Sequence, residues 1–330
     1  MLCGKGERGM TKAKKIWLIT AASLLLLGCI IFGSMMAMLN WDFSKLSSGK
    51  YETNRHEIKE AFRDISIDTR TAHITFVPTD NAQCSVECFE QEKQKHTVTV
   101  EDGILSIKAE DTRKWYEYIG FDFGTPRITV YLPRGAYGAL SVTASTGDLD
   151  IPEDFSFQNM AVSLSTGSVS NMASVTEHIK IKTSTGAISL SEITAASLDL
   201  SVSTGKVILT GVDCAEDIKI KVSTGKVNLS DVTCRDLTAE GSTGDIVLKN
   251  VIAGGALSVK RSTGDVTFDA SDAAEIYVNT DTGDVKGSLL SEKVFIANTD
   301  TGKKEVPNSI TGGRCEITTD TGDIKITIMP

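Results

Sequence analysis

Apolar and polar residues alternate with a period of two along most of the chain, from about residue 61 to its end. In the C-terminal part the alternation is organised around a recurring phrase, Ser-Thr-Gly or Asp-Thr-Gly, at intervals of 19 or 20 residues. A regular period of this length is typical of stacked repeat proteins, in which each repeat contacts only its neighbours. The phrase occurs ten times, with its glycines at Gly147, Gly167, Gly186, Gly205, Gly225, Gly244, Gly264, Gly283, Gly302 and Gly322.

The residues around each glycine predict short β-strands with one buried face. Aliphatic residues stand five before, two after and four after most of the glycines, as Ile220, Val227 and Leu229 do around Gly225. Glycine permits a corner with positive φ. We therefore predict an all-β fold with a parallel β-solenoid (β-helix) over residues 141–330, in about ten coils of strand, Thr-Gly corner, strand and looser return. A propeller with two repeats per blade is the alternative, but odd and even copies look alike.

Residues 61–140 also alternate but lack the phrase, and Asp102-Gly103 is a hairpin signal. We predict a β-rich cap that is continuous with the solenoid, because an uncovered solenoid end is an unpaired sheet edge. Residues 324–328, at the other end, carry no obvious polar cap. We therefore expect copies of the chain to associate with one another through the solenoid ends.

One uncharged apolar stretch, residues 16–40, is long enough for an α-helix that crosses a bilayer. Residues 1–15 carry five basic residues against one acidic residue, so the positive-inside rule predicts a cytoplasmic basic tail and an extracytoplasmic bulk, which begins with a linker at 41–60. The alternatives are a cleaved signal peptide and a lipoprotein, since Leu26-Leu27-Gly28-Cys29 resembles a lipidation box. The apolar run continues past this cysteine, which favours an uncleaved single-pass anchor in the cell membrane.

The charge of the chain excludes one class of partner. The net charge is −9, from 34 basic and 43 acidic residues, and the basic tail makes the remainder still more acidic. A duplex-binding protein needs the opposite sign, so we exclude nucleic acid. Hydrophobic residues make up 41% of the chain, which excludes disorder for most of it.

The cysteines and histidines give no clustered metal motif. The four histidines, at 56, 73, 96 and 178, are scattered along the sequence, which argues against a zinc site. Cys214 and Cys234 each stand nine residues after a repeat glycine, so they should stack about 5 Å apart in adjacent coils. That separation suits a disulfide and two buried free thiols equally.

Acidic residues gather at the last corners. Equivalent positions form columns in a parallel stack, so we expect a single column of Asp281, Asp300 and Asp320, with Asp284 and Asp323 beside it. Carboxylates this close repel one another or share a cation, and calcium is the hard, oxygen-liganded candidate. Solvated turn residues that keep the rod soluble are the alternative. We expect no other cofactor.

A second candidate site lies between two predicted strands, at residues 114–123, where aromatic residues are concentrated. Exposed rings there would stack on sugars or anchor a protein partner. The alternative is that they cover the apolar end of the solenoid. The candidates for partner binding are Trp115, Tyr116, Tyr118 and Phe121.

The chain resembles the bacterial putative adhesin family, a β-strand-repeat domain of unknown function on a membrane anchor. The resemblance rests on the Ser-Thr-Gly-Asp-Val type repeats, on the segment Ile128-Thr129-Val130-Tyr131-Leu132-Pro133 that leads into them, and on the apolar stretch followed by Trp41-Asp42-Phe43. It covers nearly the whole chain. It implies a β-solenoid and a role at the cell surface, and it brings no catalytic motif.

We interpret the chain as a non-catalytic, adhesin-like binding or scaffold module of the cell envelope. The partners expected besides the membrane are an extracellular polysaccharide or a surface protein, held by repeated weak contacts. Two other classes stay open. One is a polysaccharide-processing β-helix enzyme, although no unrepeated cluster of carboxylates is visible in the sequence. The other is an envelope-stress regulatory protein that binds a membrane partner.

Overall fold

A computed structural model of the chain describes residues 12–41, 50–80, 83–112 and 124–329. The helix and the β-strands belong to separate compact units. The helix, α1 (Lys12–Met38), starts before the predicted 16–40 because lysine and alanine are good helix formers. Among the described residues it is the one helix long and apolar enough to cross a membrane. Its length, composition and position near the N-terminus suit a membrane anchor and a signal sequence alike.

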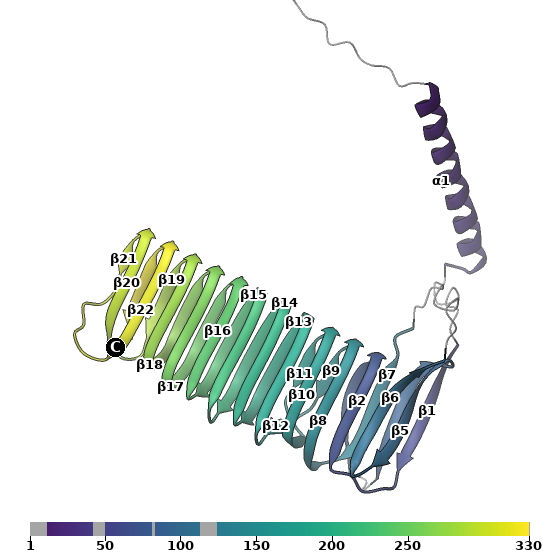
Figure 1. Cartoon of the computed structure of the whole chain (residues 1–330), viewed down its shortest axis with the longest axis horizontal. Helices are drawn as coiled ribbons and strands as arrows, with labels where there is room; N and C mark the ends of the chain where they lie inside the picture. The colour runs from purple at the N-terminus through teal and green to yellow at the C-terminus, as the bar shows by residue number, and fades with distance from the viewer. Residues whose placement is uncertain (1–11, 42–49, 81–82, 113–123, 330) are drawn as a thin grey trace, which may run out of the picture. The chain divides into compact units, whose positions relative to one another are not determined.

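The second unit is built from 23 strands joined in one continuous ladder (Figure 1). The N-terminal part contains β1 (Tyr51–Ile58), β2 (Asp64–Thr71), β3 (His73–Thr79), β4 (Cys84–Gln91), β5 (Gln94–Glu101), β6 (Ile104–Asp111) and β7 (Arg127–Pro133). The first repeats contain β8 (Gly135–Thr146), β9 (Leu149–Ile151), β10 (Phe155–Thr166), β11 (Val169–Asn171) and β12 (Ser174–Val175).

In three of the coils that follow, one long strand runs through the glycine corner: β13 (His178–Ala195), β14 (Ser197–Cys214) and β15 (Asp217–Cys234). Next come β16 (Asp236–Thr243), which ends just before Gly244, and β17 (Ile246–Thr263) and β18 (Val266–Thr282), each of which runs from one repeat glycine to the next. The last coils contain β19 (Val285–Leu289), β20 (Lys293–Thr301), β21 (Lys304–Glu305), β22 (Gly313–Thr321) and β23 (Ile324–Ile328). The parallel pairing of successive repeats confirms the predicted β-solenoid.

Each regular coil has three sides rather than two strands and a loose return. In β14 and β15 the register runs from Leu198↔Ile218, across both corners, to Asp213↔Thr233. The predicted loose return is therefore a third paired segment. The second corner lies six residues after the repeat glycine, where the backbone has positive φ at Glu192, Gly211, Asp231, Asn250 and Ala270.

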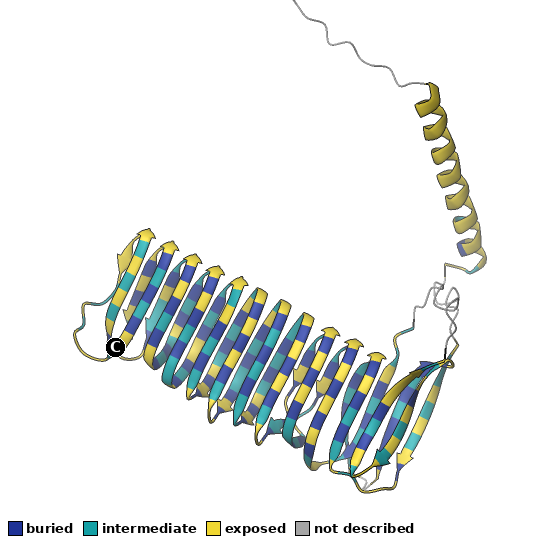
Figure 2. Cartoon of the chain, in the orientation of Figure 1, coloured by how far each residue is buried: buried dark blue, intermediate teal, exposed yellow. Residues whose placement is uncertain are grey.

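The core is a set of columns that run along the solenoid. Figure 2 shows buried and exposed residues alternating along the strands, as the period of two requires. Each inward side chain stacks on its equivalent in the next coil, ~4.8 Å away. Burying an aliphatic side chain contributes roughly 1.5–3 kcal/mol, so these columns are the main source of stability. The column two residues after the glycine is fully buried at Ile188, Val207, Val227, Ile246 and Val266.

The predicted cap at 61–140 is partly solenoid. Strands β2 and β3 form a coil whose corner is Ala72, and they pair in parallel with β8 and β9 of the first repeat. Strands β6 and β7 stack on the outer side of this coil. Beyond them the pairing becomes antiparallel, with β5 on β6, and with β4 on β7 followed by β1. The antiparallel strands therefore cover this end of the parallel stack.

The opposite end departs from the order of the sequence. Strand β22 pairs with β18 on one side and with β20 on the other, and β23 lies between β19 and β21 in the same way. The outermost coil is thus β20–β21, and the later coil β22–β23 is enclosed by it. Residues 324–328 are therefore not simply the open edge that we expected, because β21 pairs with the first two of them.

Candidate functional site

The repeat glycines occupy the first corner of each coil. All ten have φ between +121° and +159°, a region that L side chains rarely adopt. A Cβ at any of them would lie only 1.5–2.2 Å from a backbone oxygen of the neighbouring coil. The corner therefore requires glycine both for its backbone conformation and for the close stacking of the coils.

The position after the glycine forms a ladder in which carboxylates accept hydrogen bonds from backbone N–H groups. The Asp265 carboxylate accepts one from Asp284 N at 2.9 Å, and the Asp284 carboxylate accepts one from Asp323 N at 2.9 Å. Asp323 in turn accepts a hydrogen bond from Lys303 N at 2.8 Å. Backbone N–H groups of the neighbouring coils thus supply hydrogen-bond donors to the Asp284 and Asp323 carboxylates.

The other predicted carboxylates share a row on the outside of the same corner. The pairing of β18, β22 and β20 gives the order Asp281, Asp320, Asp300, which differs from the sequence order that we expected. All three residues are exposed. Within the described part of the chain, these carboxylates do not bring three ligand atoms within 4.8 Å of one another. Calcium binding at this column stays a prediction.

Cys214 and Cys234 end the third side of adjacent coils, and both are free, buried thiols. The Cys214 thiol donates a hydrogen bond to the Ala196 carbonyl oxygen at 3.2 Å. Burial raises the pKa of Cys214 to about 11 and that of Cys234 to about 12. Of the two arrangements that the spacing allowed, the structure has the pair of buried thiols.

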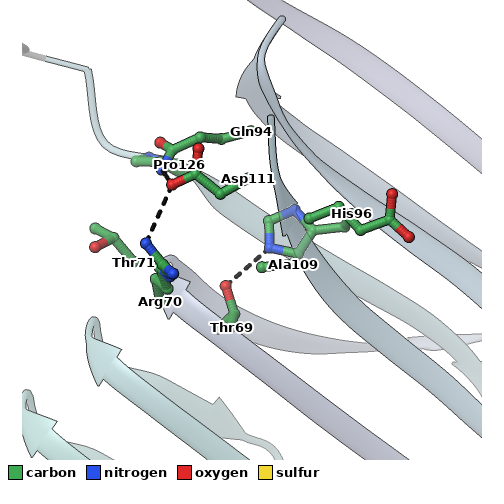
Figure 3. Close-up of a pocket in the computed structure, with 9 residues that line it drawn as sticks. Thr69, Arg70, Thr71, Gln94, His96, Ala109, Asp111 and Pro126 are labelled. Carbon is green, nitrogen blue, oxygen red and sulfur yellow. Dashed lines mark hydrogen bonds and ion pairs between the residues drawn. The ribbon is translucent and has the colours of Figure 1, made fainter. Parts of the chain in front are cut away.

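The aromatic candidates Trp115, Tyr116, Tyr118 and Phe121 lie outside the described residues. A pocket lies between the ends of β2, β5 and β6 and Pro126 (Figure 3). Arg70 pairs there with Asp111 at 3.1 Å, and Gln94 donates a hydrogen bond to the same carboxylate at 3.2 Å.

A buried network of polar side chains, which the sequence analysis did not predict, reaches the wall of this pocket. The Thr69 hydroxyl lies 2.8 Å from His96 Nε2, as the dashed line in Figure 3 marks, and His96 Nδ1 lies 2.6 Å from a Glu90 oxygen. Asn54 Nδ2 donates to the other Glu90 oxygen at 2.7 Å. Burial opposes ionisation of Glu90, but the hydrogen bonds from His96 and Asn54 outweigh it and hold its pKa below the usual range.

The order hydroxyl, imidazole, carboxylate is that of an acyl-transfer triad, but the surroundings suit a structural role. Thr69 is only 4% exposed. The pocket has an accessible volume of about 20 Å³, which is enough for a single water molecule and too small for a substrate. The sequence contained one local sign of this polar network, because Glu90 and His96 are six residues apart on either side of a tight turn.

The middle coils carry exposed lysines on the strand segment that precedes the glycine. In one row Lys182, Lys221 and Lys260 alternate with Ser201 and Glu240 from coil to coil. In the neighbouring row the order is Lys180, Asp199, Lys219. We call the five lysines 180, 182, 219, 221 and 260 the lysine face. An open groove of about 320 Å³ runs through it, lined by Asp199, Lys219, Ile220, Lys221, Thr238 and Glu240.

Next to Lys260, the charged side chain of Arg261 points inward instead. Arg261 is 1% exposed, and its Nη1 donates to the Val222 carbonyl oxygen at 2.8 Å. Its Nε and Nη2 are buried and have no hydrogen-bond partner among the residues that the structure describes. Gly241, one coil earlier, makes the room, because a Cβ there would lie 2.1 Å from Arg261 Nη1.

The repeats identify the family. The family described as Toastrack DUF4097 matches the chain in two successive stretches, residues 62–216 and 213–329. The chain belongs to this family. The Toastrack match begins just before β2, so it covers the whole solenoid and leaves α1 and β1 outside. Among curated proteins, no match is found.

Several solved structures resemble the chain. A putative adhesin from Parabacteroides distasonis is 12% identical, with a TM-score of 0.44, over 85% of this chain and 98% of that one. A putative lipid binding protein from the same species is 17% identical, with a TM-score of 0.43, over 85% and 98%. A putative adhesin from Bacteroides fragilis is 15% identical, with a TM-score of 0.41, over 85% and 99%. At these values the likeness says nothing about what this chain binds.

Proposed function

We propose that the chain is an adhesin-like, non-catalytic binding module that holds an anionic polymer of the cell surface on its lysine face. The lysine face is the observation that carries this proposal. Five lysines stand there against two carboxylates, Asp199 and Glu240, in a chain whose net charge is −9. A local positive surface on an acidic protein attracts anions selectively.

The spacing of the lysines favours a polymer over a small anion. Lys182, Lys221 and Lys260 are two coils apart in one row, which is ~9.6 Å at the usual strand spacing. An extended chain of sugars or phosphodiesters with a regularly repeated anionic group can meet several of them at once. Repeated weak contacts of this kind add up to a much higher overall affinity.

The lysines of the row are available for such contacts. All three are exposed. Lys180 has an Asp199 oxygen at 3.8 Å, whereas the described residues offer Lys182, Lys221 and Lys260 no carboxylate within 4.0 Å. A ligand therefore need not displace an existing ion pair from this row.

The proposal includes a membrane anchor, with α1 in the cell membrane and the β unit on the outer side. The apolar length of α1 and the basic residues that precede Ile16 support this topology. It is tested by treating intact cells with protease. The β unit should be digested in intact cells and the N-terminal tail should be protected. Protection of both, or release of the β unit into the medium, contradicts the anchor.

Binding is tested by retention of the full chain in detergent on beads that carry a uronate polymer, a glycerol phosphate polymer or neutral dextran. We expect retention on the anionic beads that falls with added salt, because salt screens exposed charges. Released reducing ends are measured in the same samples, and their appearance would favour the enzyme alternative.

The matched variants separate the lysine face from general charge. The triple variant Lys182→Gln, Lys221→Gln, Lys260→Gln should lose more than about tenfold in retention. The control removes three exposed lysines from the segment that follows the glycine, at 249, 286 and 325, and should stay within about twofold of the wild type. Equal losses in the two variants would refute the lysine face as the binding site.

A further inference from the structure

Three side chains with metal-ligating atoms meet in the interior at the N-terminal end of the β unit. Cys88 and Glu90 lie two residues apart on β4, and His96 lies on β5. One ligand atom from each lies within 4.8 Å of the other two, the only such group among the described residues. All three are buried, with exposed fractions of 0% for Cys88, 1% for Glu90 and 6% for His96.

The fold explains why these polar groups meet. Strands β4 and β5 share a single bridge, Gln91↔Gln94, next to the tight turn that joins them. The strands then part, and β4 continues beside β1 and β7 while β5 continues beside β6. Cys88, Glu90 and His96 point into the space between these two layers. Val86 on β4 and Leu105 on β6 are fully buried and belong to the hydrophobic core of the same unit.

We propose that Cys88, Glu90 and His96 bind a divalent metal ion of the zinc class. Thiolate, imidazole and carboxylate are the ligands that zinc takes in proteins, and three protein ligands leave a fourth position for water. A thiolate ligand makes calcium and magnesium poor occupants, because these ions prefer oxygen. The site is independent of the lysine face and of the proposed function.

The outer contacts of the three residues already have the pattern of a metal centre. A metal-bound histidine normally hydrogen-bonds through its other ring nitrogen, and a metal-bound carboxylate is held by a further donor. Here the Thr69 hydroxyl oxygen lies 2.8 Å from His96 Nε2, and Asn54 Nδ2 donates a hydrogen bond to Glu90 Oε1 at 2.7 Å. This leaves His96 Nδ1 and Glu90 Oε2 facing each other, on the side shared with Cys88.

The charges also balance. A divalent ion with a Cys88 thiolate, a Glu90 carboxylate and a neutral His96 gives a neutral buried site. Binding releases the thiol proton to solvent. Metal binding also requires that His96 Nδ1 lose its proton. If the imidazole is charged, this proton goes to solvent. If the imidazole is neutral, the proton moves to Nε2, and Nε2–H then donates a hydrogen bond to the Thr69 hydroxyl. Without the metal, burial and the nearby Glu90 and Glu87 raise the pKa of Cys88 to about 12, so the thiol keeps its proton.

The test is a titration of the full chain in detergent, stripped with a chelator, with Co²⁺ as a spectroscopic substitute for Zn²⁺. We expect one Co²⁺ per chain, a thiolate-to-cobalt charge-transfer band, and loss of that band when Zn²⁺ is added. Cys88→Ser should abolish the band and His96→Asn should weaken Co²⁺ binding at least about tenfold. Cys84→Ser, a buried cysteine on the same strand, is the matched control and should keep the band.

A second measurement covers variants that fail to fold. In the wild type, Zn²⁺ should raise the denaturant midpoint of unfolding, because an ion that binds only the folded state stabilises it. The proposal is overturned if the wild type gives no thiolate band, if the band survives Cys88→Ser, or if Zn²⁺ leaves the unfolding midpoint unchanged.

Discussion

Alanine at Gly225 tests how tightly the corners of the solenoid are stacked. Gly225 has φ +142°, and a Cβ there would lie 1.5 Å from the Gly205 carbonyl oxygen. Since Cβ atoms essentially never approach another heavy atom within 3.0 Å, the two coils would have to separate locally by at least 1.5 Å. That is about a third of the ~4.8 Å spacing between coils, too much for the ladder hydrogen bonds on either side to survive.

The expected cost follows from these two effects. A side chain in this glycine-only backbone region costs about 1–3 kcal/mol. The loss of the two flanking ladder hydrogen bonds costs about 1 kcal/mol each. Gly225→Ala should therefore lower the free energy of unfolding by about 3–5 kcal/mol.

The measurement is urea unfolding of the chain, followed by far-UV circular dichroism, with hydrogen exchange to locate the opened coils. Gly254→Ala is the matched control, because its Cβ would meet nothing closer than the Cys234 carbonyl oxygen at 3.8 Å. Its free energy of unfolding should change by less than about 1 kcal/mol. The reasoning fails if the two alanine variants unfold at the same urea concentration.

Three further predictions concern buried polar groups. Arg261→Met should raise the free energy of unfolding by about 1–4 kcal/mol, because it removes a buried guanidinium two of whose nitrogens have no hydrogen-bond partner among the described residues. The hydrogen bonds that lower the pKa of Glu90 stabilise the fold above the unfolded pKa of ~4.3, and this contribution is lost as the pH falls through the lower folded pKa. Glu90→Gln should therefore flatten the acid limb of a stability curve. Cys214 and Cys234, buried and with pKa values of about 11 and 12, should resist alkylation in the folded chain and react only on unfolding.

Each of these has a result that would contradict it. A loss of stability in Arg261→Met would mean that its long side chain is needed for packing around Gly241. An acid limb that is identical in wild type and Glu90→Gln would show that other carboxylates control acid unfolding. Rapid labelling of Cys214 in native buffer would mean that the end of the third side opens readily.

The solenoid could be predicted from the sequence because one local rule is repeated. The ten glycines fix the first corner, and the aliphatic residues two and four places after them fix the buried face. The second corner was missed because Glu192, Asp231, Asn250 and Ala270 share no residue type, although all have positive φ. Asparagine and aspartate tolerate this conformation but glutamate and alanine do not favour it, so the residues at this place carry no repeated signal.

The buried site was missed for a different reason. Glu90 and His96 are close in sequence, but their contact depends on β4 and β5 parting into two layers, which a pattern of alternation does not reveal. Thr69 and Asn54 complete the network from β2 and β1. Likewise, nothing in the repeats indicates that β22 would lie between β18 and β20.

That exchanged order at the end of the solenoid has a consequence for how the chain is made. The ribosome releases β20 before β22, yet β22 is the ladder partner of β20 among the described strands. The outer coil must therefore wait, unpaired, until the following segment has emerged and inserted beside β18. A chain interrupted in the intervening loop would expose both edges of β20, and exposed strand edges invite aggregation and proteolysis. The end of the rod thus closes only around the segment made after it.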